Sequence, residues 1–245
     1  DSSQIPTYLV SEMTKKSVTV ALSGDGADEL FCGYSRYILA DMTWNKICMI
    51  PKILKYPLQG ILRTLPENFL NKLSSPISPF VPESLKVRNF GKNIHRFASF
   101  MNYQNEKSLY FEIMSNFKNP HNIINGFNGS FSKINQEIGL EGMNFKEWMM
   151  FQDTSSYLPG NILTKVDRAS MAVSLEARVP LLDHRIVSFA WSLPIEWKYS
   201  GNQSKSILRK ILYKHVPAKM VDRPKAGFTC PIKNWLSGPL KEWCE

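Results

Sequence analysis

The sequence predicts an α/β fold that is mostly helical and has few strands, with the strands parallel. Two observations lead to this prediction. Residues 18–22 (VTVAL) form a short aliphatic and β-branched run, which is typical of a strand buried on both faces of a parallel sheet. From residue 148 to residue 212 the apolar residues instead recur mainly at helical spacing.

The chain begins with a predicted helix that ends before the strand. Ser2 or Ser3 can cap this helix, and Tyr8, Leu9 and Met13 are expected on its inner face.

The strand breaks into a turn, residues 23–26 (SGDG). Two glycines around Asp25 let the backbone bend sharply and bring its N–H groups close to a bound group. The apolar residues Leu30, Phe31 and Tyr34 then begin a helix. A strand, a glycine-bounded turn and a helix N-terminus together predict an anion or nucleotide site at the carboxyl end of a parallel sheet.

Three acids lie within this segment. Asp25, Asp28 and Glu29 stand at i, i+3 and i+4, so they would share one side of a helical first turn. Acids at a helix N-terminus are often simple caps. Alternatively, one carboxylate holds Mg²⁺ together with phosphate oxygens, and another faces the reacting substrate. The spacing alone leaves both interpretations open.

The middle of the chain carries little functional signal. Residues 37–61 predict broken helices, and a stiff loop is expected around Pro76, Pro79 and Pro82. Aromatic residues at loose helical spacing in residues 94–117 predict core packing. Residues 119–142 are rich in Asn, Gly and Ser and predict turns.

The second half predicts a series of helices. Residues 148–157 form one that ends near residues 158–160 (LPG), and residues 161–177 form the next. Asp167 and Arg168 lie off the apolar face of that helix. Glu176 is expected at its end, among apolar neighbours, where a carboxylate needs a partner such as Arg178 or a substrate amine.

Two further helices complete the pattern. Asp183 is expected to cap a helix whose inner residues are Ile186, Val187, Phe189 and Ala190. Ser204 begins another helix, with Lys205 near its start. The inner residues expected for that helix are Ile207, Leu208, Ile211 and Leu212. Residues 223–228 (RPKAGF) then form a loop that presents Lys225.

Composition narrows the class of partner. The net charge is +9, which suits a solvated basic surface or a site for ATP or pyrophosphate. No basic stripe is interleaved with aromatic residues, so we do not expect nucleic acid as a partner. The cysteines lack metal-site or disulfide-scaffold spacing, and no apolar run reaches about 18 residues. We therefore expect a cytoplasmic protein with reduced thiols and no membrane contact.

Three separated motifs carry a family resemblance. Residues 23–34 (SGDGADELFCGY), 174–183 (SLEARVPLLD) and 223–228 (RPKAGF) resemble, in order, motifs of the glutamine-hydrolysing asparagine synthetases. The resemblance implies an adenine-nucleotide α-hydrolase-like (ATP pyrophosphatase) fold. It implies that residues 1–245 are the C-terminal part of the synthetase domain. The sequence contains neither the pyrophosphate loop of form SGGxDS nor the N-terminal glutaminase domain, so we expect this piece to be inactive alone.

The resemblance also implies a reaction and a set of roles. ATP and Mg²⁺ would activate a carboxylate, with aspartate as the expected acceptor, as an acyl-adenylate, and ammonia from glutamine would form the amide. The implied catalytic residues are Asp25, Glu176 and Lys225. The implied nucleotide-site residues are Ser23, Gly24, Gly26 and Lys205, the substrate-site residues are Asp167 and Arg168, and the Mg²⁺ ligand is Asp28.

Several alternatives remain open at this point. Asp25 stands where some members have Glu and lactam-forming relatives have Tyr, so a sugar or peptide carboxylate could be the acceptor. Glu176 could serve only in a salt bridge that braces its turn. The chain could also be a non-catalytic binding module with a basic surface. The implied partners are the small-molecule substrates and the glutaminase domain, and a homodimer is left open.

Overall fold

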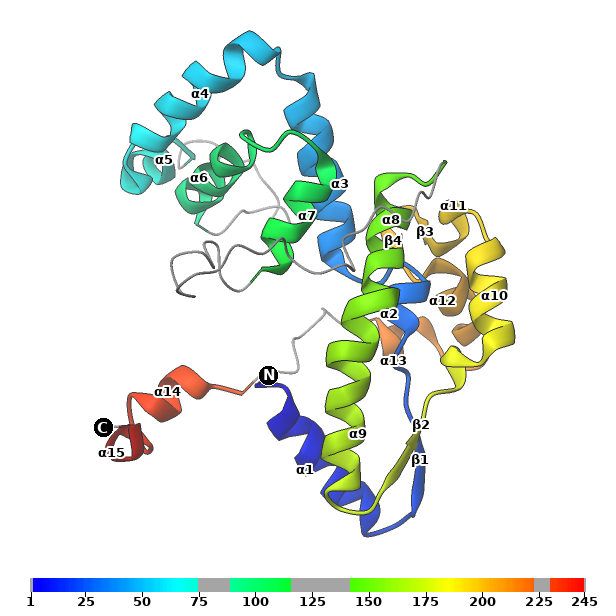
Figure 1. Cartoon of the computed structure of the whole chain (residues 1–245). Helices are drawn as coiled ribbons and strands as arrows, with labels where there is room; N and C mark the ends of the chain where they lie inside the picture. The colour runs from blue at the N-terminus through cyan, green and yellow to red at the C-terminus, as the bar shows by residue number, and fades with distance from the viewer. Residues whose placement is uncertain (1, 75–88, 116–141, 223–229, 245) are drawn as a thin grey trace, which may run out of the picture. The chain divides into compact units, whose positions relative to one another are not determined.

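A computed structural model describes residues 2–74, 89–115, 142–222 and 230–244. Within these ranges the chain is mostly helical and has two small sheets (Figure 1). One sheet is parallel, as predicted, and the other is an antiparallel pair, β3 (Tyr199–Ser200) and β4 (Gln203–Ser204). The chain divides into two compact units. The first comprises Asp1–Tyr34 with Leu140–Glu245, and the second comprises Ser35–Gly139.

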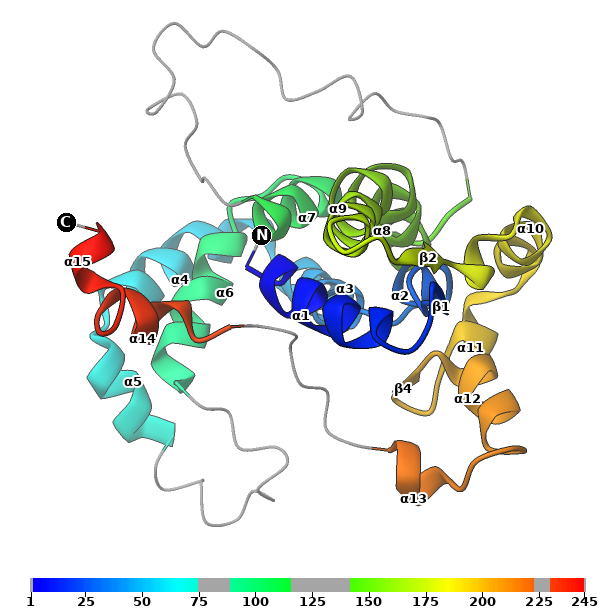
Figure 2. The ribbon, with the colours of Figure 1, turned by 90° about the horizontal axis from the view of Figure 1, so that it is seen from below.

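The second unit is helical in its described part. Its helices are α3 (Ser35–Met49), α4 (Lys52–Thr64), α5 (Glu67–Ser74), α6 (Phe90–Phe100) and α7 (Glu106–Met114). Helix α6 packs against α4 and α5 (Figure 2), and α3 packs against α7.

The hydrophobic core of this unit confirms the prediction that aromatic residues between positions 94 and 117 pack in a core. Ile47, Phe100, Met101 and Leu109 are buried together, and Phe97 and Tyr103 pack against them with other apolar residues. The predicted helix break lies between α3 and α4, whereas Pro57 is contained within α4. The prolines of the predicted stiff loop and residues 119–141 lie outside the described ranges.

The first unit contains the parallel sheet. Strand β1 (Val20–Leu22) pairs with β2 (Glu176–Arg178), with Val20 opposite Glu176 and Leu22 opposite Arg178 (Figure 1). Burial of β1 on both faces was a wrong prediction for the described residues, because Val20 and Leu22 are 37% and 75% exposed.

Helix α1 (Gln4–Lys15) packs against α9 (Thr164–Met171), but not through the residues we expected. Tyr8, Leu9 and Met13 are exposed, and the buried residue of α1 is the small Ser11. Ser3 occupies the N-cap position without a side-chain capping bond.

One long helix runs through the unit without the predicted break. It consists of α8 (Phe145–Gln152), the π-helical segment η5 (Asp153–Leu163) and α9. Pro159 lies inside η5, so the ending that we expected at residues 158–160 was wrong. In a π-helix the hydrogen bonds join residues five apart, and these wider turns accommodate a proline that would disturb a regular α-helix. The Thr164 hydroxyl donates to the Pro159 carbonyl at 2.8 Å.

The same helix ends earlier than predicted. It stops at Met171, and Ser174 adopts a left-handed conformation with φ of 58°. The Leu175 amide then donates to the Ser170 carbonyl at 3.0 Å, which closes the helix C-terminus. Glu176 therefore begins strand β2 and does not end a helix.

A second hydrophobic core packs the helix that follows the turn of residues 23–26 against helices that follow β2 in the sequence. Helix α2 (Ala27–Leu30) contributes Leu30, which is buried with Phe31 and Ala190. Residues of η6 (Pro180–Leu182), α10 (His184–Ser192) and α12 (Ser206–Leu212) pack against them. Helix α11 (Ile195–Lys198) packs against α12. The remaining helices of the unit are α13 (Ala218–Val221), α14 (Ile232–Leu236) and α15 (Lys241–Cys244).

The predicted inner faces of α10 and α12 are confirmed in part. Ile186, Val187, Ile207 and Leu208 pack against the second core. The prediction was wrong for Phe189, Ile211 and Leu212, which are exposed. Asp183 caps α10 as expected, because its carboxylate accepts from the Arg185 amide at 2.9 Å. These short helices bury a narrower stripe than an extended amphipathic pattern suggests.

Two absences concern the described ranges. None of their cysteines forms a disulfide. Across the same ranges, no helix combines the length and apolar character that a membrane span requires.

Candidate functional site

Residues 23–26, which form the acidic turn, follow the carboxyl end of strand β1 in the parallel sheet. The Ser23 amide donates to the Arg178 carbonyl at 2.7 Å, which extends the pairing of β1 with β2 by one bond. Gly26 precedes α2 with φ of 83°, and a Cβ there would lie 2.5 Å from Leu182 Cδ2. The left-handed backbone conformation favours glycine at this position, and a side chain there would also require Leu182 to shift. The predicted order of strand, glycine turn and helix is confirmed.

The turn presents polar groups at the surface of the unit. The Ser23 hydroxyl donates a short hydrogen bond to the Asp25 carboxylate, and the Asp25 amide lies 3.4 Å from the Ser23 oxygen. Gly24 is exposed, and nothing lies within 4 Å of the position its Cβ would take. A ligand can therefore approach the backbone at Gly24 and the carboxylate of Asp25.

The three acids do not share one side, in contrast to our expectation. Asp25 pairs with Ser23, whereas Asp28 lies 3.2 Å from Lys205 Nζ. Glu29 is buried and accepts a hydrogen bond from the Tyr34 hydroxyl at 2.8 Å. Asp25 precedes α2, and the neighbouring residues 28 and 29 point about 100° apart on a helix. One acid is thus accessible, one is paired with a cation and one is internal.

Glu29 was given no role by sequence reasoning, although its surroundings set it apart. Burial raises the pKa of the Glu29 carboxyl, and the nearby charges of Asp28 and Asp153 act in the same direction, while the hydrogen bond from Tyr34 opposes them. The Tyr34 ring meets the Tyr157 ring edge to face, with centroids 6.1 Å apart. Glu29 therefore links the acidic motif to η5. The apolar residues that follow it in the sequence are a signal that could have indicated its burial.

Glu176 lies at the amino end of its strand. The register places it opposite Val20, three residues before Ser23, which is roughly 10 Å along a strand. Its side chain is exposed and forms an ion pair with Arg178 at 2.7 Å. The expected apolar surroundings of Glu176 were therefore wrong, since it begins an exposed strand, while Arg178 is its partner as predicted.

Asp167 and Arg168 are exposed on α9. The structure gives no hydrogen bond or ion pair between either residue and the acidic turn in the described ranges. Their neighbour Lys165 instead reaches Ser3 Oγ at 3.2 Å and ties α9 to the start of α1.

Lys225 lies outside the described residues, but the chain that leads to it is anchored. Asp222 Oδ1 accepts from Arg209 at 2.5 Å and from the Tyr213 hydroxyl at 2.7 Å. Gln203 donates to the same Tyr213 hydroxyl at 3.1 Å. This network, which the sequence did not predict, fixes the last described residue before the Lys225 motif.

The described residues do not assemble a metal site by themselves. They contain no group of three or more His, Cys, Asp or Glu side chains arranged to hold an ion. Mg²⁺ in phosphate-transfer sites is often held by one or two carboxylates with phosphate oxygens and water. Asp28 is suited to supply one such carboxylate, but one of its oxygens already faces an ammonium group.

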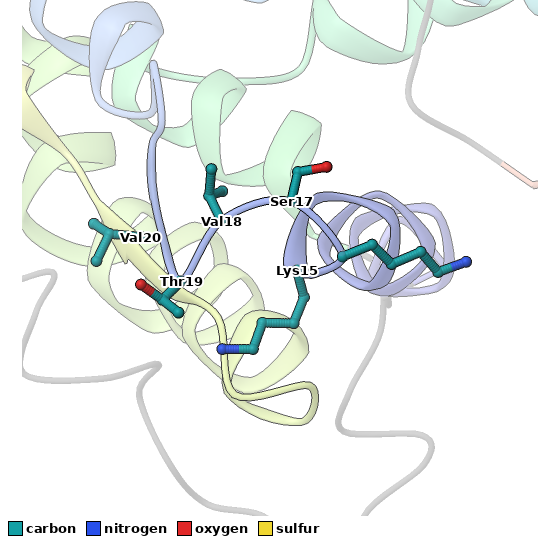
Figure 3. Close-up of a pocket in the computed structure, with 6 residues that line it drawn as sticks. Lys15, Ser17, Val18, Thr19 and Val20 are labelled. Carbon is teal, nitrogen blue, oxygen red and sulfur yellow. The ribbon is translucent and has the colours of Figure 1, made fainter.

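An open pocket elsewhere does not coincide with these residues. It is lined by Lys15, Lys16, Ser17, Val18, Thr19 and Val20 (Figure 3). These residues connect the end of α1 to the amino end of β1, whereas the acidic turn follows the carboxyl end of that strand. We assign this pocket no role in the chemistry.

Comparison with known proteins decides the family. The family model described as asparagine synthase matches residues 1–245. The chain belongs to the asparagine synthase family. The resemblance of the three motifs is thereby confirmed over the whole sequence.

Individual relatives agree with this assignment. The chain is 31% identical over 99% of its length to asparagine synthetase [glutamine-hydrolyzing] 1 of Bacillus subtilis (strain 168), and it covers 35% of that protein. It is equally identical to a putative asparagine synthetase [glutamine-hydrolyzing] of Mycobacterium tuberculosis (strain ATCC 25618 / H37Rv), covering 34% of it. The amidase chyE of Penicillium rubens is 22% identical over 95% of the chain.

The chain therefore spans about a third of the length of the curated relatives that it matches. No solved structure matches it significantly.

Proposed function

We propose that this chain is part of the synthetase domain of an enzyme that uses ATP to convert a carboxylate into an amide. The acidic turn at the carboxyl end of a parallel strand pair carries this proposal, because its geometry suits nucleotide binding. The chain that carries the turn belongs to the asparagine synthase family. Aspartate is the proposed acceptor, because the similar proteins of Bacillus subtilis and Mycobacterium tuberculosis are named asparagine synthetases.

The proposed reaction has two steps. A carboxylate oxygen of the acceptor attacks the α-phosphorus of ATP, and pyrophosphate leaves, which gives an acyl-adenylate. Ammonia released from glutamine then attacks the acyl carbon, AMP leaves, and the nitrogen loses a proton. The glutaminase activity is assigned to a part of the enzyme outside the sequence that matches this chain.

Each proposed role comes from the family resemblance and is compatible with the position and chemistry of the residue. Ser23, Gly24 and Gly26 belong to the turn after β1, in which Gly24 is exposed, Ser23 is half-buried and Gly26 is buried, and they are the proposed nucleotide contacts. Asp25 is proposed to position the incoming amine from its half-buried place in that turn, where its carboxylate accepts from the Ser23 hydroxyl. Asp28 is the proposed carboxylate partner of Mg²⁺, which accompanies ATP.

Three further roles have less geometric support. Glu176 is proposed to assist with the amine, although in this structure it pairs with Arg178 at the far end of β2. Asp167 and Arg168 are proposed to contact the substrate from the exposed face of α9.

Lys225 is the residue we propose to stabilise the negative charge that develops in both steps. A preorganised cation beside such charge is worth about a hundredfold or more in rate. Lys225→Ala is therefore expected to reduce acid-dependent pyrophosphate release by about a hundredfold or more. The measurement is pyrophosphate release by the whole enzyme with ATP, Mg²⁺ and a panel of carboxylic acids.

Lys219→Ala is the matched control for that experiment, because Lys219 is an exposed lysine on α13. It should leave the release unchanged. The proposed function would be contradicted if no acid on a broad panel stimulated pyrophosphate release. If a sugar or peptide acid stimulated release most strongly, that class of acid would replace aspartate as the proposed acceptor.

A further inference from the structure

Helix α4 of the second unit packs against its neighbours along one face. Leu58 and Leu62 on that face contact the hydrophobic core of the unit, and α4 packs against α6. The Gln59 side chain is buried on the same face, and its amide nitrogen donates to the Ala98 carbonyl at 2.9 Å. The inner face of α4 is therefore satisfied by contacts within the unit.

The opposite face of α4 is apolar and exposed. Ile53 is 87% exposed and Tyr56 is 78% exposed, and Leu54 and Ile61 are exposed as well. Ile53 and Leu62 are nine residues apart, which is about two and a half helical turns, so they point in opposite directions. We call Ile53, Leu54, Tyr56 and Ile61 the apolar face of α4. Large apolar side chains that remain exposed together mark an interaction surface.

Basic residues border the apolar face of α4. Lys52 and Arg63 are exposed, and they are eleven residues apart, which is about three helical turns, so they lie along the same edge of the helix. Lys55 is half-buried near that edge. The ion pairs of the described ranges involve none of these three residues. Residues 42–66, which include α4, contain four basic residues and neither Asp nor Glu.

The charge around this face indicates what it binds. A second copy of the chain would bring its own basic residues against these, and like charges repel, so the charge disfavours self-association. A negatively charged surface instead complements Lys52 and Arg63. A fluid lipid layer also needs no groove matched to a single helix, whereas a protein partner has to bury the same side chains in a complementary surface. Helices with an apolar face bordered by Lys and Arg lie in the plane of the bilayer interface.

We propose that α4 binds the surface of an anionic lipid layer, with its apolar face among the acyl chains and with Lys52 and Arg63 at the headgroups. The helix has 13 residues and would lie along about 20 Å of the interface. Our expectation of no membrane contact rested on the absence of a long apolar run, and a helix that lies in the interface needs no such run. The inference goes beyond the proposed function, because α4 belongs to the unit without the acidic turn.

The test is co-sedimentation of the whole chain with two kinds of vesicle, one of phosphatidylcholine alone and one that also contains about 30% phosphatidylglycerol. We expect binding to the anionic vesicles to be about tenfold tighter or more, because each basic residue near an anionic surface strengthens binding. Raising the ionic strength to about 1 M should remove most of that difference, since charges are then screened over about 3 Å.

Ile53→Ser combined with Ile61→Ser removes two apolar side chains from exposed positions. This variant should bind anionic vesicles about tenfold more weakly or less tightly still, because less apolar area enters the lipid. Leu9→Ser combined with Val10→Ser is the matched control, since both residues are exposed on α1 of the first unit. The control should change vesicle affinity less than about twofold. Circular dichroism verifies that each variant is folded.

Lys52→Gln combined with Arg63→Gln addresses the charges alone. It should weaken binding to the anionic vesicles about tenfold and leave binding to phosphatidylcholine within about twofold. The proposal would be overturned if neither kind of vesicle bound the chain, if both bound it equally, or if the Ile53 and Ile61 variant bound as the unsubstituted chain does. A dimer in sedimentation equilibrium without vesicles that this variant dissociates would also overturn it, in favour of self-association. Pyrophosphate release tests the proposed function separately from these measurements.

Discussion

At the scale of single residues, Glu29 shows how one motif holds carboxylates with opposite properties. It is 1% exposed and bonded to Tyr34, whereas Asp25 four residues earlier is half-buried and bonded to Ser23. Removing a carboxylate from water favours its protonated form, and the pKa of Glu29 is accordingly raised. Glu29 is therefore a buried packing group, although it lies in the same motif as the half-buried Asp25.

The raised pKa of Glu29 predicts a pH-dependent contribution to stability. Its contribution is fully present below the ordinary pKa of 4.5 and is lost as pH rises through the raised value, because the folded protein binds the proton more tightly than the unfolded chain does. Glu29→Gln keeps an acceptor for Tyr34 without the charge. We expect its stability relative to the unsubstituted protein to increase as pH rises from about 4 to 8.

Urea unfolding at several pH values measures this effect. Glu12→Gln is the control, since Glu12 is exposed on α1 and its substitution should change stability little at any pH. A difference for Glu29→Gln that stays constant across the pH range would contradict the prediction.

At the scale of elements, the long helix formed by α8, η5 and α9 is stabilised by a capping box at its N-terminus. Asn144 accepts a hydrogen bond from the Glu147 amide, and Glu147 accepts one from the Asn144 amide, each at 3.0 Å. This capping box satisfies two backbone donors that the first helical turn would otherwise leave unpaired. The helix then continues through Pro159 because its turns widen there.

Asn144→Ala should therefore destabilise the protein by about 1 kcal/mol, the usual cost of losing an N-cap side chain. The free energy of urea unfolding provides the measurement. Asn45→Ala serves as a comparison, because Asn45 is exposed inside α3 and alanine is a good helix former there. Equal losses for the two variants would mean that the capping box does not stabilise the helix.

At the scale of the whole molecule, two units have separate cores. Leu30, Phe31 and Ala190 form one core in the unit that carries the acidic turn. The other unit buries Leu109 with Ile47 and neighbouring residues. Each core buries its own apolar side chains. A destabilising substitution can therefore be made in the second unit without changing any residue that packs near the acidic turn.

Leu109→Ala tests the core of the second unit. Leu109 is fully buried, so its truncation should cost about 2–5 kcal/mol of unfolding free energy. Leu39→Ala, at a position that is 61% exposed on α3, should cost much less. Denaturant unfolding followed by circular dichroism distinguishes them, and a similar loss for both would show that Leu109 does not support a packed core.

Local features of the fold were largely predictable. The turn around Gly26, the Asp183 cap and the core aromatic residues each depend on a few neighbouring residues, and all were found as expected. Helix ends were less predictable. Pro159 did not stop its helix, and Ser174 in a left-handed conformation stopped it before Glu176.

By itself the sequence determined the family and the order of strand, turn and helix, because these are recorded in motifs of adjacent residues. Only the tertiary structure decided which partner each acid of the motif meets. Lys205 reaches Asp28 and η5 packs beside the Glu29–Tyr34 pair through contacts between segments far apart in the chain. Spacing records which side chains are available, whereas burial and charge pairing depend on what the folded chain brings beside them.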